Sequence, residues 1–305
     1  MRFLIKRTST QDIDGIVAVI NESSHGFSFQ FRVDRTTFLA LSRFWNFSYQ
    51  HSYIGYHDSQ AGGVIINSVD HGAREGYSFY WGVLPQFRRG GLGLALYNAY
   101  LDQAAGEGFA STYGDTSLDS PHSIFRRLGY ETQQELVQMR GSVPSSYFSQ
   151  QDSNEPPVRG IHPEEFFEAL GHSQSARHCW MQRPRALRKA APFLRFVKSG
   201  NTYAAYLPYP QGSMVMDCIW DDPAERPVLA LLSHIATHSG GGLCQFFAVP
   251  VRSALHGLLT ELGFTVTNRS EAMVLDLQHW RGQSRGVVSG QTLQPHRADA
   301  PTTNC

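Results

Sequence analysis

The sequence predicts an α/β (α+β) protein of two successive lobes, in which strands and helices alternate around a sheet. Apolar runs with the period of strands alternate with runs that have the period of helices. Residues 142–158 break this pattern with Ser, Gln, Pro and Asn, as expected of a linker. Ser120–Tyr130 and Arg252–Phe264 both read as a short helix running into Leu-Gly-aromatic before a strand. That likeness indicates a duplicated fold.

Length and composition agree with two packed domains. The chain has 305 residues, of which 41% are hydrophobic, and ~150 residues is a typical domain length. Its 26 Lys and Arg balance 26 Asp and Glu, so no excess positive charge favours nucleic acid. Four cysteines without C-x-x-C spacing predict reduced thiols and no metal site. No apolar run reaches the ~20 residues that span a bilayer, so we expect a cytoplasmic protein without membrane association. We expect it to be a monomer or a homodimer.

The first half begins with a strand and a helix that Ser9 is placed to cap. Ile13, Ile16 and Ile20 share one face of that helix. The short helix near residue 125 is stopped by glycine. The strands expected in this half are Phe3–Lys6, Ser52–His57, Gly63–Val69, Gly76–Val83, Ala110–Asp115 and Leu136–Arg140, and the helices are Asp12–Asn21, Thr36–Phe47, Leu92–Ala105 and Pro121–Leu128.

The second half follows a similar order after the linker. A Gly/Gln/Ser/Pro-rich segment, residues 281–305, closes the chain and is expected to be a mobile tail. The strands expected here are Phe193–Val197, Tyr203–Leu207, Met214–Trp220, Cys244–Val249 and Met273–Leu277, and the helices are His162–Leu170, Pro184–Ala191, Pro227–His238 and Val251–Leu262.

The segment Val83–Gly93, VLPQFRRGGLG, predicts an anion site. Pro85 ends the preceding strand because it cannot donate to a sheet, and an apolar helix begins directly after the glycines. Free amides at a helix start attract anions, and glycines let the backbone approach a phosphate closely. A Walker A loop is excluded because no Lys-Ser/Thr follows, and the dinucleotide fingerprint G-x-G-x-x-G is absent.

This loop resembles motif A of the Gcn5-related N-acetyltransferase (GNAT) superfamily, R/Q-x-x-G-x-G/A after a strand ending in V-x-P. Ile124–Tyr130 resembles that family's motif B, commonly L-Y-x-x-L-G-F. The resemblance covers residues 1–141 and implies an acyl-CoA-dependent N-acyltransferase with acetyl-CoA or CoA as cosubstrate. It implies pyrophosphate binding by Val83, Arg88, Arg89, Gly90, Gly91, Leu92 and Gly93.

The same resemblance implies a residue that removes a proton from the attacking amine. Glu75, just before the strand that leads to the loop, and His122, at the start of the motif B helix, are the candidates. His25 is a weaker one. Phe125 stands where the family often has a tyrosine that protonates the leaving thiolate, and phenylalanine cannot donate a proton. Water, Ser123, His122 or Tyr113 would then substitute, or the thiolate leaves unaided, or the domain binds coenzyme A without turnover.

The second half, residues 159–280, has no glycine loop at the equivalent place. Asp221 and Asp222 stand there and would repel phosphate. By resemblance this half is a degenerate second GNAT lobe, so each lobe is a mixed central sheet flanked by helices. Tandem members of the family such as mycothiol synthase have this plan. The basic run Arg183–Lys198 is either a solvated face or a site for an anionic acceptor or the adenosine 3′-phosphate.

These observations predict acyl transfer to a small-molecule amine held between the lobes. Two alternatives stay open at this point. One is a non-catalytic acyl-CoA-binding regulator, which Phe125 makes conceivable. The other is an acyltransferase acting on a protein or on a carrier-bound amine.

Overall fold

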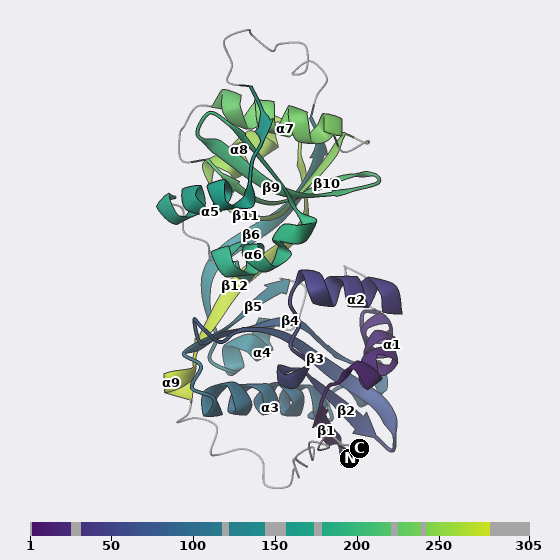
Figure 1. Ribbon diagram of the computed structural model, residues 1–305. Coiled ribbons are helices and arrows are strands. Elements are labelled where there is room, and N and C mark those ends of the chain that lie inside the picture. The colour runs from purple at the N-terminus through teal and green to yellow at the C-terminus, as the bar shows by residue number, and fades with distance from the viewer. Residues whose placement is uncertain are drawn as a thin grey trace, which may run out of the picture.

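The computed structural model describes residues 2–25, 32–117, 122–143, 157–173, 179–220, 225–238 and 242–280. Most of the predicted linker and the predicted tail at 281–305 lie outside these residues. Figure 1 shows two stacked lobes, with the N-terminal half of the chain forming most of the lower one. Among the described residues, no helix is both long enough and apolar enough to cross a membrane.

The first half contains the predicted elements in the predicted order, with ends shifted by a few residues. Ser9 caps the chain before the first helix through a capping box with Asp12. The elements are β1 (Leu4–Arg7), α1 (Ile13–Ser23), α2 (Arg35–Phe44), β2 (Tyr53–His57), β3 (Gln60–Asp70), β4 (Glu75–Val83), α3 (Leu92–Gly106), β5 (Ser111–Ser117), α4 (His122–Arg127) and β6 (Glu131–Ser142).

The second half repeats the alternation of strands and helices, as expected. Its last strand is much longer than the predicted one, because it starts eight residues earlier, at Thr265. The elements are β7 (Arg159–Gly160), α5 (Pro163–His172), α6 (Pro184–Ala190), β8 (Arg195–Ser199), β9 (Thr202–Tyr209), β10 (Gly212–Ile219), α7 (Glu225–His238), β11 (Leu243–Pro250), α8 (Ala254–Glu261), β12 (Thr265–Asp276) and α9 (Leu277–Trp280).

One mixed sheet runs through both lobes. Its 12 strands lie in the order β1-β2-β3-β4-β5-β12-β6-β11-β10-β9-β8-β7. The last strand of each half has therefore crossed over: β12 pairs with β5 of the first half, and β6 pairs with β11 of the second. The two crossing strands also pair with each other, antiparallel. The predicted division at residues 141 and 159 separates the two halves of the chain. In the sheet, each half instead contributes one strand to the lobe of the other.

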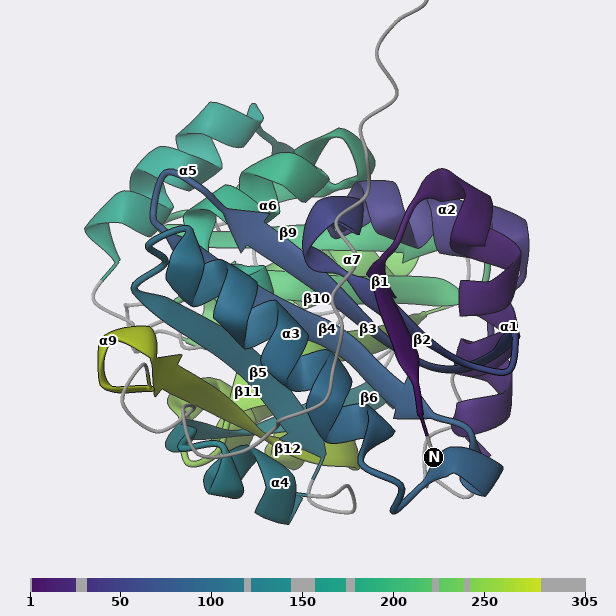
Figure 2. The same cartoon turned by 90° about the horizontal axis from the view of Figure 1, so that it is seen from below.

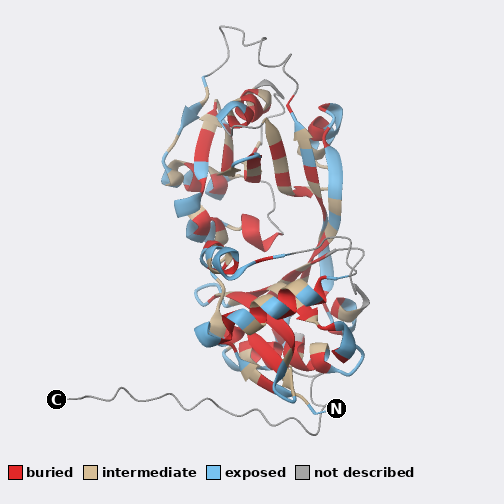
Figure 3. Cartoon of the chain, turned by 90° about the vertical axis from the view of Figure 1, so that its right-hand side faces the viewer, coloured by how far each residue is buried: buried red, intermediate tan, exposed pale blue. Residues whose placement is uncertain are grey.

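The exchange of β6 and β12 between the lobes is also seen in the hydrophobic cores. Met273, Leu275, Leu277 and Trp280, all from the C-terminal end, are buried in the core that α1, α3 and β2–β4 build. Val137 and Met139 of β6 are fully buried in the core of the second lobe. Figure 2 shows α3 lying across the sheet of the first lobe. Figure 3 shows buried residues running along the strands. Each lobe is complete only with a strand from the other half.

The predicted duplication is visible at both crossing points. Gly129 after α4 has φ 91°, and Gly263 after α8 has φ 81°. Tyr130 N–H then donates to Phe125 O at 3.0 Å, and Phe264 N–H donates to Leu259 O at 2.9 Å. A left-handed glycine with this bond is a common helix stop. The same stop turns the chain into β6 in one half and into β12 in the other.

Each lobe also has one parallel strand pair that opens beside a β-bulge. In the first lobe, β4 and β5 are paired only as far as Ser78 and Gly114, and the bulge residue on β4 is Phe79. In the second lobe, β10 and β11 are paired as far as Val215 and Phe246, and a register shift follows on β10. A bulge bends its strand, so each pair splays apart into a V-shaped opening.

A chain truncated to residues 1–143 should fail to fold, because it lacks the strand that pairs with β5. Met273 and Leu275 are among the side chains that would leave the first core, and each such side chain contributes ~1.5–3 kcal/mol when fully buried. Circular dichroism and gel filtration should show an unfolded or aggregated product. Fusing residues 262–280 through a flexible linker should restore a folded, monodisperse lobe. A well-folded 1–143 fragment would contradict the dependence on β12.

Candidate active site

The glycine loop joins the open end of β4 to α3. A 3-10 turn, η3 (Pro85–Phe87), follows the strand, and Arg89 and Gly91 then take positive φ values of 60° and 86°. Leu92, the first residue of α3, is fully buried, whereas Arg88–Gly91 are exposed. The buried leucine therefore anchors the helix, and the exposed loop lies in front of the helix N-terminus.

The start of α3 leaves backbone amides free for an anion. The first intrahelical bond joins Ala95 N–H to Gly91 O at 3.0 Å, so the amides of Leu92, Gly93 and Leu94 have no carbonyl of their own helix to bond. They carry the positive end of the helix dipole. These groups fit a pyrophosphate, which needs several N–H donors and no base-specific contact.

Gly93 and Gly91 meet different requirements of this cradle. A Cβ on Gly93 would lie 3.1 Å from the Trp81 ring and 3.3 Å from Val83 Cγ2, so a side chain would force the helix away from β4. A Cβ on Gly91 would meet nothing within 4 Å, but φ of 86° strains any other residue. Gly93 thus allows close packing, and Gly91 allows the turn.

The two arginines have separate roles. Arg88 Nε donates to Val83 O at 3.0 Å, and Arg88 Nη2 donates to Ser23 O at 2.8 Å. Arg88 therefore ties the loop to the end of α1, a structural function that the sequence alone did not indicate. Arg89 is exposed on the loop and is the arginine whose position best suits attraction of phosphate.

A cavity of about 650 Å³ lies between the two lobes. It reaches the point where β4 and β5 separate, since Phe79, Tyr80 and Trp81 line it from β4 and Asp115 lines it from β5. The opposite side comes from the second half: Leu207, Met214, Gln245, Phe247, Ala248, Asn268 and Ser270. The cavity therefore meets β4 in the half of the strand that leads into the glycine loop.

Asp115 is the acidic side chain that lines this cavity. It follows Gly114, the last β5 residue paired with β4. Tyr77 Oη donates to Asp115 Oδ2 at 2.9 Å, and Cys179 Sγ donates to the same oxygen at 3.5 Å. Burial raises the pKa of Asp115 to about 6, although these two hydrogen bonds act to lower it. No described residue donates to Oδ1, so one carboxylate oxygen is available to a ligand.

Both donors to Asp115 stay neutral near pH 7. Burial, followed by the charge of Asp115, raises the pKa of the Tyr77 hydroxyl and of the Cys179 thiol well above their ordinary values. Tyr77 is also held in place, because its ring stacks on Trp180 with centroids 5.8 Å apart. Asp115 is thus a fixed carboxylate that titrates close to neutrality. Sequence reasoning missed it because a lone aspartate in a predicted strand carries no motif.

The structure places Glu75 in an ion pair at the start of β4. This residue begins β4, at the end of the strand opposite the glycine loop. Tyr113 Oη donates to Glu75 Oε1 at 3.1 Å, and Arg183 Nη1 donates to Oε2 at 2.5 Å. The Arg183 guanidinium also lies over the Tyr113 ring, 3.9 Å from its centroid. Glu75 therefore joins the segment before α6 to the first lobe, away from the splayed strands.

The remaining candidates for proton transfer divide into three cases. Helix α4 begins at His122, as expected, but the side chains of His122 and Ser123 lie outside the described residues. The Tyr113 hydroxyl donates to Glu75, and Tyr113 is not among the residues that line the cavity. His25 is exposed and lies 3.8 Å from Glu22, outside the cavity lining.

Phe125 is a packing residue in this fold. It is 9% exposed and lies edge-on to Trp81, Tyr97 and Tyr130. A Cβ on Gly114 would come within 2.8 Å of its ring, so the ring fills the space that the glycine leaves. The sequence-based view that Phe125 supplies no acid agrees with this position.

In the second lobe, a side chain closes the equivalent opening. Gln182 ends the short turn η5 (Trp180–Gln182) and is 8% exposed. Its Nε2 donates to Met216 O of β10 at 3.1 Å and to Ala248 O of β11 at 2.9 Å. The amide thus bridges the two splayed strands where a thioester would have to enter. The predicted aspartate loop, Asp221 and Asp222, lies outside the described residues.

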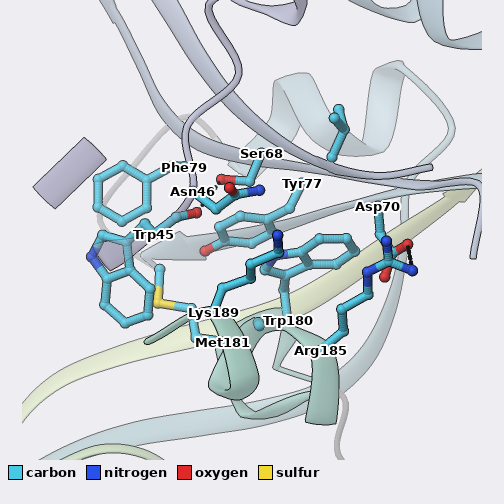
Figure 4. A pocket seen from close by; sticks show the side chains of 12 residues that line it. Trp45, Asn46, Ser68, Asp70, Tyr77, Phe79, Trp180, Met181, Arg185 and Lys189 are labelled. Carbon is cyan, nitrogen blue, oxygen red and sulfur yellow. Dashed lines mark hydrogen bonds and ion pairs between the residues drawn. The ribbon is translucent and has the colours of Figure 1, made fainter. Parts of the chain in front are cut away.

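The basic run Arg183–Lys198 is engaged with carboxylates of this chain. Arg185 pairs with Asp70 at 2.6 Å, Arg188 with Glu164 at 2.7 Å, and Lys198 with Glu165 at 2.7 Å. Figure 4 shows the Arg185–Asp70 pair beside a small pocket of about 30 Å³, which residues of α6, β3 and β4 line. Ion pairing within the chain therefore accounts for these three residues without an anionic ligand.

Comparison with known proteins agrees with this geometry. Residues 19–130 match the model of the acetyltransferase (GNAT) family. The N-terminal lobe is a GNAT acetyltransferase domain. Its class of activity is acyl-CoA-dependent N-acyl transfer, and acetyl-CoA is the usual cosubstrate of the family. No curated relative matches the sequence.

Solved structures share the fold over 90% of this chain. A GCN5-related N-acetyltransferase from Sphaerobacter thermophilus has TM-score 0.64 at 14% identity, covering 90% of this chain and 96% of its own. A tandem GNAT protein from the clavulanic acid biosynthesis pathway has TM-score 0.64 at 11% identity, covering 90% and 98%. A GCN5-related N-acetyltransferase from Kribbella flavida has TM-score 0.58 at 13% identity, covering 90% and 70%. The tandem GNAT fold is thereby confirmed, and the likeness to mycothiol synthase stays a prediction.

Replacing Gly91 by Ala should weaken coenzyme A binding by ~10-fold or more, because strain of ~1–2 kcal/mol at positive φ displaces the amides of the loop. Gly108→Ala is the matched control. Gly108, just after α3, has φ 80° and equally open surroundings, so its strain should lower stability without changing coenzyme A affinity. Titration calorimetry with coenzyme A checks both variants. Equal affinities for the two would contradict the assignment of the loop.

Glu75→Gln should leave acyl transfer close to the wild-type rate and lower the free energy of unfolding by about 1–3 kcal/mol, since it leaves the half-buried Arg183 charge without its partner. Glu164→Gln, at the exposed pair with Arg188, should change stability little. Urea unfolding and steady-state kinetics measure the two effects. A large loss of turnover at unchanged stability would support a catalytic role for Glu75.

Proposed function

We propose that this chain transfers an acetyl group from acetyl-CoA to a small-molecule amine bound in the cavity between the lobes. The observation that carries the proposal is the position of the cavity, which meets β4 and β5 where they separate. The pyrophosphate would bind the amides at the start of α3, so the thioester would reach that point along β4. The second lobe would supply half of the acceptor site and bind no coenzyme A, because Gln182 bridges its strands.

Asp115 is the proposed proton acceptor. The amine nitrogen attacks the thioester carbonyl carbon, the C–N bond forms and the C–S bond breaks, and the sulfur leaves as thiolate. The proton lost by the nitrogen goes to Asp115 Oδ1, to which no described residue donates a hydrogen bond. Tyr77 and Cys179 hold the other oxygen, so they orient the carboxylate without competing for that proton. A pKa of about 6 makes Asp115 ionised at pH 7.

Thiol release from acetyl-CoA in the presence of a broad panel of amines tests the activity directly. Native mass spectrometry of the purified chain should show bound coenzyme A. Bound cofactor with no thiol released by any amine would favour the alternative of a non-catalytic acyl-CoA-binding regulator. Release only with protein or carrier-bound amines would favour the other alternative.

Asp115→Asn should lower kcat/KM by ~10²-fold or more, the usual contribution of a general base. In the wild-type protein, kcat/KM should rise with pH through about 6 as Asp115 ionises, with Tyr77 and Cys179 neutral throughout. The variant should lose this rise. Asp102→Asn, which removes an exposed carboxylate from α3, should keep both the rate and the pH profile.

The same substitution should stabilise the fold. Asp115 has a folded pKa of about 6 against an ordinary 3.8, so its contribution to stability is present below pH ~4 and is lost as pH rises through 6. At pH 7, Asp115→Asn should therefore raise the free energy of unfolding by about 1–3 kcal/mol, because the neutral amide avoids the cost of keeping a buried carboxylate ionised. Chemical denaturation at pH 4 and pH 7 checks the sign. A destabilised variant at pH 7 would mean that Asp115 is a structural anchor.

A further inference from the structure

The acceptor cavity has an aromatic wall that both lobes build. The Trp45 ring lies 6.0 Å from Phe79 of β4 and 5.9 Å from Phe247 of β11, measured between ring centroids. Phe44 and Met214 also line the cavity, from α2 and β10. Burying apolar surface of this kind under a ligand makes binding more favourable, in proportion to the area removed from water. The wall therefore favours an acceptor with an apolar, flat body.

The charge lining the cavity has one sign. Asp115 is the ionised residue among the described lining side chains, and none of them is Lys, Arg or His. In the nearby run Arg183–Lys198, Arg183, Arg185, Arg188 and Lys198 are paired with carboxylates, and Lys189 lines the small pocket beside Asp70 and not this cavity. An anionic group in this cavity would meet the Asp115 charge without a cation to offset it, whereas an ammonium group would find a carboxylate in poorly hydrated surroundings.

Polar groups on the second-lobe side are neutral. Gln138, Gln245 and Ser270 line the cavity from β6, β11 and β12, and no described residue makes a hydrogen bond to their side chains. They can bond an uncharged hydroxyl or amide on the acceptor body. Recognition in this cavity thus combines one negative charge at the splayed strands, an apolar middle and neutral donors and acceptors at the far side.

Building on the proposed acyl transfer, we propose that the acceptor is a primary amine on an apolar aromatic body that carries no carboxylate or phosphate. Its ammonium group binds Asp115, which places the nitrogen beside the opening between β4 and β5. The body packs against Trp45 and Phe247. Asp115 therefore binds the ammonium form of the acceptor. The ammonium releases one proton to solvent before the nitrogen attacks, and Asp115 accepts the second proton, which the nitrogen loses as the amide forms. Acidic amines such as free amino acids are excluded by charge, and small polar amines are excluded by the lack of apolar contact.

Titration calorimetry on the full chain with coenzyme A present tests this class. The probes are 2-phenylethylamine and tryptamine, their carboxylated counterparts phenylalanine and tryptophan, and ethanolamine. Both aromatic amines should bind, tryptamine more tightly because it buries more apolar area. The carboxylated counterparts and ethanolamine should bind ~10-fold or more weakly. Asp115→Asn should weaken tryptamine binding ~10–100-fold, and Asp102→Asn should leave it unchanged.

Acetylation assays with the same probes separate this inference from the proposed function. Tryptamine that binds as expected and releases no thiol from acetyl-CoA would overturn the function and leave the ligand class standing. Tryptophan, ethanolamine or a lysine peptide acetylated with higher kcat/KM than tryptamine would overturn the ligand class and leave the function standing. Aromatic amines that fail to bind, or bind equally well to the Asp115→Asn protein, would also overturn the class.

Discussion

The exchange of β6 and β12 is the constraint on which the rest of the structure depends. Each of these strands leaves its own half after a left-handed glycine and completes the sheet of the other half. Because the two also pair with each other, the lobes are held in one orientation by backbone hydrogen bonds as well as by side chains. A cavity whose walls come from both lobes can then keep a fixed shape, which precise placement of an amine requires.

Each lobe has a V-shaped opening between two parallel strands, β4 and β5 in the first and β10 and β11 in the second. The side chains at the two openings differ. In the first lobe, a glycine loop with free amides stands beyond the opening, and Asp115 faces the cavity beside it. In the second lobe, Gln182 spans the opening with two hydrogen bonds to backbone carbonyls. One buried amide thus closes the second opening, in the lobe whose sequence also lacks a glycine loop. It leaves the second lobe free to contribute surface such as Phe247 to the shared cavity.

The sequence predicted the local features and missed the long-range ones. The loop at Val83–Gly93 and the two helix–glycine–strand units were found because each depends on residues close together in the chain. The exchange of β12 was missed because a strand's apolar pattern does not identify its partner. The ion pair of Glu75 could not be predicted for a related reason: its partner Arg183 is 108 residues away. Asp115 was missed because its importance comes from the splayed strands, Tyr77 and Cys179, which only the fold brings together.

The position of β12 in the chain also sets an order of events during synthesis. A ribosome releases β1–β6 long before residues 265–276, so the edge of β5 must wait for more than half of the protein to be made. An unpaired strand edge is a template for wrong pairing, and contacts this distant in sequence form slowly. The nascent first half therefore exposes the β5 edge until β12 has been made.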